Sequence, residues 1–213
     1  MKGKVYLVGA GPGDYKLLTL KGLECIKKAD VIVYDRLANK NYLKEAKENC
    51  EFIYVGKASS NHTLPQDDIN RVIADKAKEG KIVTRLKGGD PYVFGRGGEE
   101  GELLKEEGIE FEVVPGITSA IGGLCYAGIP ITHRDHASSF HVITGHLRDD
   151  DKENPEINWN ALANTNGTLV FLMGVANLQK ISSNLIKEGK SKDTPVALIS
   201  WATRSNQRVI TST

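Results

Sequence analysis

The sequence has little cysteine and no marked excess of charge of either sign. Its three cysteines are widely spaced and form no CxxC pair, which disfavours a disulfide framework or a zinc site and is typical of a reducing compartment. The formal net charge is +1, so no overall field attracts nucleic acid or a membrane surface. An acidic partner would therefore have to meet a local cluster of Arg and Lys.

Long apolar runs and a leader segment are also missing. No apolar stretch approaches the roughly 20 residues that span a bilayer, and the chain runs from Met1 directly into the apolar pattern of a strand. These absences predict a cytoplasmic protein that binds neither membrane nor nucleic acid. A length of 213 residues suffices for one large domain or two small ones.

Short apolar runs alternate with amphipathic stretches in the first half of the chain. Strands are predicted at Lys4–Val8, Val31–Tyr34, Phe52–Val55, Ile82–Leu86 and Phe111–Val114. This alternation with helical stretches predicts a parallel sheet that has helices on its faces. Thr19 is expected to cap the first helix, with Leu20 and Ile26 on the buried side.

Pro115-Gly116 interrupts the alternation and marks the predicted domain boundary. We expect an N-terminal α/β domain over residues 1–114 and a C-terminal α/β domain over residues 115–213. Within the second domain, strands are predicted at 141–144, 168–171 and 195–199, a loop at 148–158 and a helix at 175–188. Gln207–Thr211 has the pattern of a strand that begins as the sequence stops, so we expect a C-terminal truncation or a disordered tail left out.

Glycines follow the first predicted strand in the segment Gly9-Ala-Gly-Pro-Gly-Asp14. Such a turn can hold a nucleotide, and Asp35 is placed to bind a ribose. The dinucleotide fingerprint, however, needs a glycine where Asp14 stands, and Tyr15–Leu18 separates the glycines from the helix. The segment is therefore either a nucleotide-binding turn or a tight connection from strand to helix.

The thirteen residues from Arg85 to Gly97 are the most informative segment. The predicted strand Ile82–Leu86 ends within them, and they hold four glycines, three cations and one carboxylate. So much glycine has a high entropic cost and indicates that a ligand approaches the main chain closely. Asp90 could accept hydrogen bonds from a ribose or bind an ammonium group, beside apolar contacts from Pro91 and Val93. The alternative is an Asx-turn in which Asp90 bonds only local backbone; we favour the ligand.

Polar residues follow other predicted strands as well. Thr118 and Ser119 open a helix of small residues, where hydroxyls usually cap but can also hold a carboxylate. Asp35 and Arg36 follow the second strand and Lys57 follows the third. Ends of parallel strands face the ligand crevice, so these groups could do acid–base work, although a surface ion pair is the simpler interpretation.

Four histidines lie between residues 133 and 146. Their spacing matches no metal-ligand pattern and no Cys or Glu ligand is adjacent, so no metal is predicted. A loop whose Arg134 and His146 face an anionic substrate is one interpretation, and scattered surface histidines are the other.

Taken together, these segments resemble the tetrapyrrole methylase family. The matching segments are Val8–Asp14, Tyr34–Leu37, Val55–Lys57, Arg85–Glu100, Val114–Thr118, Tyr126–Arg134, Thr144–His146 and Met173-Gly174. Each glycine motif alone is weak, whereas the ordered set is specific and extends over almost the whole chain. Arg85–Glu100 and Gly128–Arg134 point to the members that methylate uroporphyrinogen III over other precorrin methylases.

The resemblance implies two α/β domains of the tetrapyrrole methylase type with a ligand cleft between them, and a homodimer. It implies that S-adenosyl-L-methionine, leaving as S-adenosyl-L-homocysteine, methylates uroporphyrinogen III at C2 and C7 to give precorrin-2, which leads to sirohaem or cobalamin. By position, the family's cofactor contacts fall on Pro12, Gly88, Gly89, Asp90, Val93, Thr118, Ser119, Met173 and Ala202. Many relatives have Gly in place of Ala202. The proton acceptor and the proton donor fall on Asp35 and Lys57.

The implied chemistry depends on positioning, because a sulfonium methyl is electrophilic without a metal and an aligned pyrrole carbon can attack it. Asp35 and Lys57 could then shift the proton. The substrate carries many carboxylates, and its candidate partners are Arg36, Lys57, Arg85, Arg96, Arg134 and His146. Two other classes stay open, namely an NAD-dependent oxidoreductase and a non-catalytic tetrapyrrole carrier.

Overall fold

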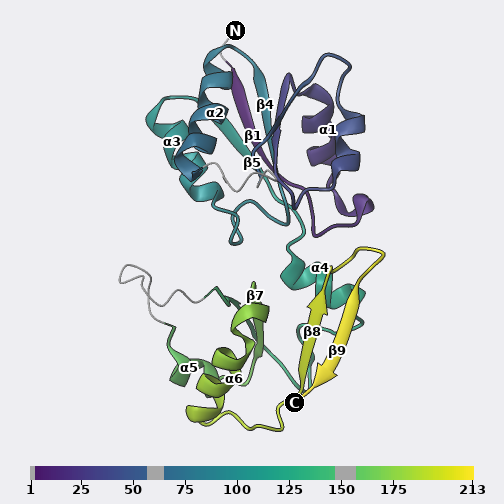
Figure 1. Cartoon of the computed structure of the whole chain (residues 1–213), viewed down its shortest axis with the longest axis vertical. Coiled ribbons are helices and arrows are strands. Elements are labelled where there is room, and N and C mark those ends of the chain that lie inside the picture. The colour runs from purple at the N-terminus through teal and green to yellow at the C-terminus, as the bar shows by residue number, and fades with distance from the viewer. Residues whose placement is uncertain (1–2, 57–64, 147–156) are drawn as a thin grey trace. The chain divides into compact units, whose positions relative to one another are not determined.

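The structure is a computed structural model that describes residues 3–56, 65–146 and 157–213 (Figure 1). The chain divides into two compact units, Met1–Gly122 and Gly123–Thr213. The division falls within helix α4, Ser119–Tyr126, whereas the sequence places the boundary at Pro115. None of the helices in the described ranges has the length and apolar character needed to cross a bilayer.

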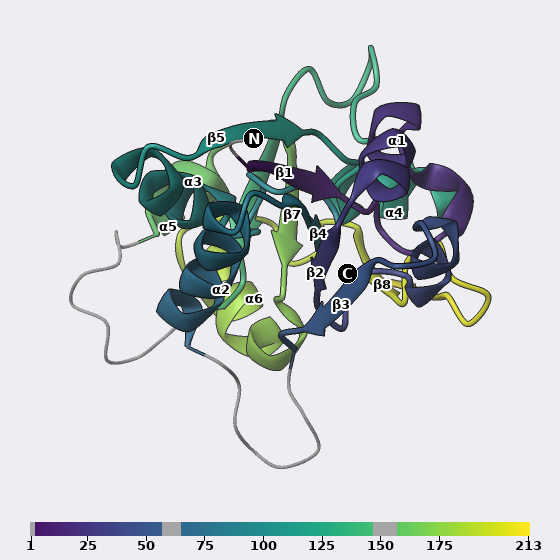
Figure 2. The ribbon, with the colours of Figure 1, turned by 90° about the horizontal axis from the view of Figure 1, so that it is seen from above.

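The N-terminal unit is built on a five-stranded sheet in the order β3-β2-β4-β1-β5. Its strands are β1 (Lys4–Gly9), β2 (Val31–Tyr34), β3 (Glu51–Tyr54), β4 (Ile82–Lys87) and β5 (Glu110–Val114). All four pairings between neighbouring strands are parallel, and the strand order can be followed in Figure 2. The predicted strands and the predicted parallel sheet are confirmed.

Helices cover both faces of this sheet, as the labels in Figure 1 show. One face packs against α2 (Gln66–Lys78) and α3 (Gly97–Glu106), and the other against α1 (Leu20–Lys28) and the 3₁₀ helix η2 (Lys40–Glu45). Alternate strand residues divide between the two cores: Val31 and Val33 face α2 and α3, and Ile32 faces α1. Because both faces are buried, β2 and most of β1 are apolar. The middle strand β4 is the exception, since it also buries Thr84, Arg85 and Lys87.

Helix α1 confirms one prediction and corrects another. Thr19 caps it, because its Oγ1 accepts a hydrogen bond of 3.0 Å from the Gly22 main-chain N–H. Leu20, however, is 82% exposed, so the prediction that it shares the buried side with Ile26 is wrong. The helix begins at Leu20 and turns its first residue to solvent, so that Gly22, Cys25 and Ile26 are buried.

The C-terminal unit contains two small sheets. In the first, β6 (Phe140–Thr144) pairs in parallel with β7 (Thr168–Leu172); in the second, β8 (Val196–Ser200) pairs antiparallel with β9 (Arg208–Ser212). Its other helices are α5 (Trp159–Ala163), the 3₁₀ helix η3 (Val175–Asn177) and α6 (Leu178–Lys187). The strand predicted at 207–211 is therefore formed as β9, and most of the loop predicted at 148–158 lies outside the described residues.

Candidate functional site

The carboxyl ends of β1, β4 and β5 lie side by side and their following turns approach very closely. A Cβ built on Gly9 would lie 2.5 Å from the Cα of Gly116, and one built on Gly116 would lie 2.3 Å from the carbonyl oxygen of Gly89. Both distances are far below van der Waals contact, so glycine is required at Gly9 and Gly116. We call Gly9, Gly89 and Gly116 the glycine floor of the N-terminal unit.

The turn after β1 is joined to the turn after β4 by two main-chain hydrogen bonds. Gly11 N donates to Gly89 O at 3.2 Å, and Gly89 N donates to Gly11 O at 2.8 Å. The glycines thus bond a neighbouring turn and do not open a helix, since α1 starts only after η1 (Tyr15–Leu17) and behind its own cap. A dinucleotide site of the Rossmann type needs the helix start at the glycines. Pro12 packs on α4, because a Cβ on Gly122 would lie 2.9 Å from Pro12 Cγ.

Asp90 ties together the turns that follow β4 and β5. Its Oδ1 accepts a hydrogen bond of 2.8 Å from Tyr92 N, which is the Asx-turn considered as the alternative to ligand binding. Its Oδ2 accepts one of 2.9 Å from Gly116 N, 26 residues further along the chain. Asp90 therefore does more than bond its local backbone, and each carboxylate oxygen keeps a second acceptor site for a ligand.

Gly89 leaves its outer side open. It has φ +69°, and among the described residues a Cβ built on it would meet within 4 Å only the Cα of Thr118, at 3.8 Å. Gly88, by contrast, is packed against Leu37, whose Cβ would lie 2.5 Å from an added Cβ. Main chain that is open on one side and backed by tight packing on the other lets a ligand approach the backbone.

The start of α4 stands beside Gly89. Thr118 Oγ1 accepts a long hydrogen bond of 3.4 Å from Ala120 N, so its hydroxyl acts as a weak cap, as the simpler interpretation expected. Thr118, Ser119 and Val93 are all partly buried. The structure thus brings six of the predicted cofactor residues together around the ends of β1, β4 and β5: Gly88, Gly89, Asp90, Pro12, Thr118 and Ser119.

Asp35 follows β2 directly and is held by two different donors. Its Oδ1 accepts a hydrogen bond of 2.9 Å from Leu37 N, and its Oδ2 accepts one of 3.0 Å from Nη2 of Arg85. The side chain is 24% exposed, so it is supported from behind and still reaches solvent. Arg36 beside it is exposed. Lys57, the predicted proton donor, lies outside the described residues.

Arg85 has a different environment from the one that the sequence suggested. Its side chain is only 4% exposed and lies between the carboxylates of Asp35 and Glu100. The guanidinium is already paired with two carboxylates and almost completely excluded from water. Direct contact of Arg85 with the substrate therefore stays a prediction, and the observed hydrogen bond instead joins this side chain to Asp35. The position of Arg85 on β4 explains this burial, because Arg85 lies on the same face of the strand as Val83, which is the face that α2 and α3 cover.

Two charged residues beside Arg85 were missed by sequence reasoning. Lys87 Nζ donates to Glu100 Oε1 at 2.6 Å, and these side chains are 4% and 0% exposed. Burial, followed by repulsion from the Arg85 charge, lowers the pKa of Lys87. The sequence did hold a signal for the burial of Lys87, because Val83, Arg85 and Lys87 are spaced two residues apart and so lie on one face of a buried strand.

Arg96, a predicted substrate contact, lies at the start of α3 in an exposed position. Its Nε donates to Glu99 Oε1 at 2.9 Å and its Nη2 to Glu99 Oε2 at 2.6 Å. This hydrogen-bonded pair raises the pKa of Arg96 and lowers that of Glu99. The guanidinium is 57% exposed and therefore remains accessible to a carboxylate from solution.

Residues with left-handed backbone coincide with predicted site segments in both units. Phe94 and Arg96 have φ of 50° and 58°, Met173 has 61°, and Trp201 and Thr203 on either side of Ala202 have 53° and 65°. Such conformations are costly for non-glycine residues and cluster at functional sites. Met173 and Trp201 are also 57% and 52% exposed, so the C-terminal unit presents large apolar side chains at these segments.

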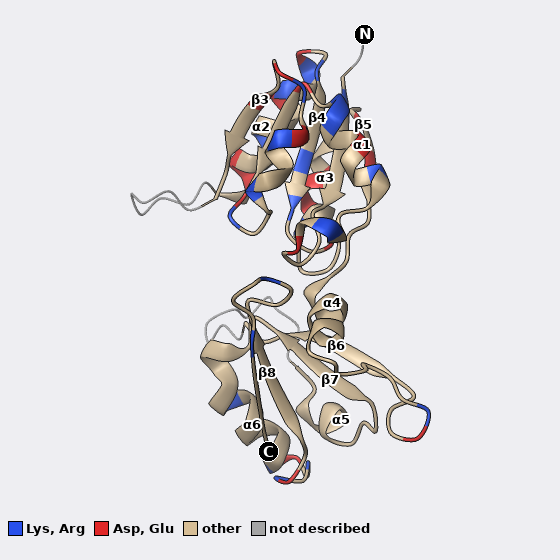
Figure 3. Cartoon of the chain, turned by 90° about the vertical axis from the view of Figure 1, so that its right-hand side faces the viewer, with Lys and Arg blue, Asp and Glu red and all other residues tan. Residues whose placement is uncertain are grey.

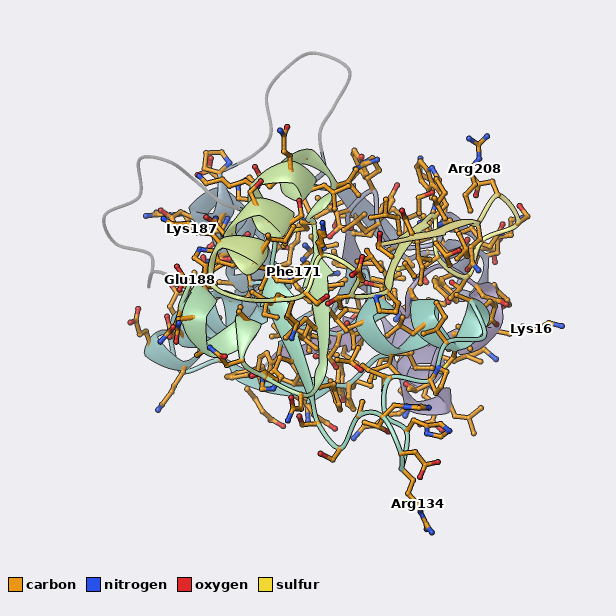
Figure 4. The ribbon with its side chains drawn as sticks, turned by 90° about the horizontal axis from the view of Figure 1, so that it is seen from below. Lys16, Arg134, Phe171, Lys187, Glu188 and Arg208 are labelled. Atoms are coloured by element: carbon orange, nitrogen blue, oxygen red, sulfur yellow. The ribbon has the colours of Figure 1, made fainter. Side chains whose placement is uncertain are left out.

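The loop after α4 carries Arg134 on a tight turn closed by hydrogen bonds between His133 and Ala137. Arg134 is exposed and extends away from the ribbon in Figure 4. The rings of His133 and His136 stack with centroids 4.8 Å apart, and His146 is exposed after β6. Among the described residues, no three His, Cys, Asp or Glu side chains are grouped so that they could hold a metal ion.

The fold is that of an α/β protein. The main chain at the carboxyl ends of β1, β4 and β5 is open to a small ligand, and these strand ends are the usual place for a ligand site on a parallel sheet. Residues 4–213 match the family described as Tetrapyrrole (Corrin/Porphyrin) Methylases. Uroporphyrinogen-III C-methyltransferase of Priestia megaterium is 56% identical over 99% of this chain and 88% of its own length. A Methanosarcina barkeri protein, S-adenosyl-L-methionine-dependent uroporphyrinogen III methyltransferase, is also 56% identical, over 99% of this chain and 82% of its own.

A solved structure agrees with these sequence matches. Uroporphyrin-III C-methyl transferase from Thermus thermophilus, complexed with S-adenyl homocysteine, superposes with a TM-score of 0.82 at 38% identity, covering 99% of this chain and 83% of that one. The chain therefore belongs to the tetrapyrrole methylase family. The expected two α/β units of the tetrapyrrole methylase type are confirmed as a fold class.

Proposed function

We propose that this protein is a uroporphyrinogen-III C-methyltransferase, which methylates its substrate at C2 and C7 with S-adenosyl-L-methionine and releases precorrin-2 and S-adenosyl-L-homocysteine. The observation that carries the proposal is the 56% identity, over almost the whole chain, to relatives named for this activity. The Thermus thermophilus structure was solved with S-adenyl homocysteine, which supports the same cofactor here.

The residues of the N-terminal unit fit such a nucleoside. Gly89 has open main chain beside Thr118, and the glycine floor fixes that main chain in place. Asp90 keeps acceptor capacity for a hydroxyl or an ammonium group. Pro12, Gly88, Val93 and Ser119 complete the proposed contacts of the N-terminal unit. Met173 and Ala202 of the C-terminal unit stay proposed cofactor contacts on the family resemblance alone.

The bound cofactor supplies an electrophilic methyl group, and the protein's own residues orient the reactants and move the proton. Asp35 accepts the proton that the substrate releases, since its carboxylate is both anchored and 24% exposed. Lys57 is the proposed proton donor. Arg36, Arg96 and Arg134 bind the carboxylates of the substrate, because an exposed guanidinium can form charge-assisted hydrogen bonds with them. The exposed ring of His146 is a further proposed hydrogen-bond partner.

We further propose that the protein acts as a homodimer in the cytoplasm. Its three cysteines are free, which fits a reducing compartment. Light scattering of the purified protein would test the dimer, and a mass equal to one chain of 23.3 kDa would contradict it.

Titration with S-adenosyl-L-homocysteine and with NADH tests the cofactor. We expect binding of the first only, with an affinity that Gly89→Ala lowers by about 10-fold or more, because a side chain at this left-handed position would stand on the open main chain. Gly98→Ala is the matched control, since a Cβ there meets nothing within 4 Å in the part of the chain that the structure describes. Binding of NADH alone would instead support an oxidoreductase.

A methyl-transfer assay with uroporphyrinogen III tests the reaction itself. Formation of a dimethylated product is expected. Cofactor binding without turnover of this substrate would favour another precorrin methylase, or a carrier that has lost activity.

A further inference from the structure

Four charged side chains form a connected cluster in the N-terminal unit, and we call Asp35, Arg85, Lys87 and Glu100 the ionic cluster. Glu100 on α3 is at its centre. Its Oε1 accepts a hydrogen bond of 3.1 Å from Arg85 Nε and another of 2.6 Å from Lys87 Nζ. Arg85 continues the chain of contacts to Asp35 at 3.0 Å. In Figure 3, basic segments of β4 lie beside acidic segments of α3.

Stability alone does not account for the ionic cluster. Three of its side chains are at most 4% exposed, and desolvation of such charges offsets much of their mutual attraction. Oε2 of Glu100 is buried and has no hydrogen-bond partner among the described residues, which adds a further cost. Apolar side chains in the same places would stabilise the core at least as well.

The geometry of Arg85 explains what the ionic cluster achieves. Its Nη1 donates to the carbonyl oxygen of Leu86 at 3.1 Å, its Nε binds Glu100, and its Nη2 binds Asp35. The planar guanidinium is therefore fixed on two sides before it reaches Asp35. A lysine could not make these contacts together, because its ammonium group is a single point charge on a flexible stem.

Asp35 is the member of the ionic cluster that reaches solvent, since its side chain is 24% exposed whereas the other three are almost completely buried. Leu37 N holds its Oδ1 and Arg85 holds its Oδ2. With both oxygens anchored, the carboxylate plane cannot rotate freely, so the remaining lone pairs point in fixed directions.

We infer that Arg85, held by Glu100, which also binds Lys87, is a positioning residue that orients the Asp35 carboxylate for proton transfer. This inference rests on the proposed function, in which Asp35 is the proton acceptor. Arg85 acts entirely through Asp35 and does not touch the substrate. Small errors in the placement of a reacting group can lower a rate by about 100-fold.

The test compares Arg85→Lys, Glu100→Gln and Asp35→Asn with the double variant Asp35→Asn/Arg85→Lys. Arg85→Lys is expected to lower kcat for methyl transfer about 10- to 100-fold, with the KM for uroporphyrinogen III and the Kd for S-adenosyl-L-homocysteine changed less than about 3-fold. Glu100→Gln should lower kcat in the same direction by a smaller factor, and it retains activity to measure if Arg85→Lys folds poorly. Arg71→Lys on the exposed side of α2 is the control and should leave all three constants unchanged.

The double variant separates positioning from a general structural role. If Arg85 acts through Asp35, adding Arg85→Lys to Asp35→Asn lowers kcat no further than Asp35→Asn alone. Multiplied losses would overturn the inference, as would a raised KM with unchanged kcat, which marks a direct substrate contact. Failure of the proposed function shows differently, because the unmodified protein would then not methylate uroporphyrinogen III, whether or not it binds S-adenosyl-L-homocysteine.

Discussion

The N-terminal unit buries whole side chains from β1, β2 and β4, whereas in the described part of the C-terminal unit the buried apolar side chains are Ala163 and Ile181. Strands β6 and β7 are mostly half-buried, and β9 is exposed along its whole length. The difference follows from sheet size, because a five-stranded sheet covered on both faces removes far more apolar surface from water than two pairs of strands.

This difference teaches where each unit can place functional groups. The N-terminal unit has enough core to hold buried charges and a closely packed glycine floor. The C-terminal unit presents exposed large side chains on left-handed backbone, at Met173 and Trp201. One unit therefore offers rigid main chain and an anchored carboxylate, and the other offers apolar side chains on its turns.

Hydrogen exchange should show the largest contrast between the units. Amides of β1 and β4 are expected to exchange only on global unfolding, while those of β9 exchange through local opening, at least about 100-fold faster. The reason is that β9 pairs with β8 alone and has exposed side chains. Mass spectrometry of peptides after deuterium labelling measures both. Equal protection of the β1, β4 and β9 amides from exchange would contradict the expected difference between the two units.

Matched core truncations should give the next largest contrast. Ile73 in α2 is fully buried, and Ile73→Ala is expected to lower the free energy of unfolding by about 2–5 kcal/mol. Ile186 in α6 is 49% exposed, so Ile186→Ala should cost less than about 1 kcal/mol. Urea denaturation followed by circular dichroism compares them, and a larger loss for Ile186→Ala would reverse the ranking of the two units.

A smaller, acid-dependent effect is expected at Asp30, which precedes β2. Hydrogen bonds from Lys47 Nζ and from Ile82 N lower the pKa of Asp30. A carboxyl whose pKa is lower in the folded protein stabilises it above the unfolded pKa of about 3.9, and this contribution is lost as the pH falls through the folded value.

Asp30→Asn should therefore destabilise the protein by about 1 kcal/mol at pH 7, where its partly exposed ion pair is screened by solvent. The difference from the unmodified protein should shrink below about pH 4. Thermal melts from pH 7 down to pH 3 measure it, and Lys47→Gln should reproduce part of the loss. A stability difference that stays constant over this range would show that Asp30 does not act through its charge.

Sequence reasoning succeeded where local pattern and burial agree. Strands β1 and β2 are mainly apolar because both of their faces are covered, so their runs could be read directly from the sequence. The end of a strand was correctly placed within the segment from Arg85 to Gly97, since β4 ends at Lys87, and Thr19 was correctly predicted as a helix cap. The family followed from the order and spacing of the glycine motifs, which the comparisons confirm.

It failed where a partner comes from a distant segment. The burial of Arg85 between Glu100 and Asp35 could not be foreseen, because no local signal shows that these two carboxylates lie against it. Leu20 was placed on a buried side because periodicity does not give the rotation of a helix about its axis. The second bond of Asp90, to Gly116 N, was likewise invisible because it joins residues 26 positions apart.

The amino-acid sequence by itself determined the parallel sheet, the glycine-rich turns after its strands and the family of the chain. Each of these features depends on residue type and on spacing along the chain. Only the tertiary structure decided which charges are buried and which remain accessible. It set Arg85 behind Asp35 and left Arg96 at the surface, since burial depends on which elements pack together and not on the residue alone.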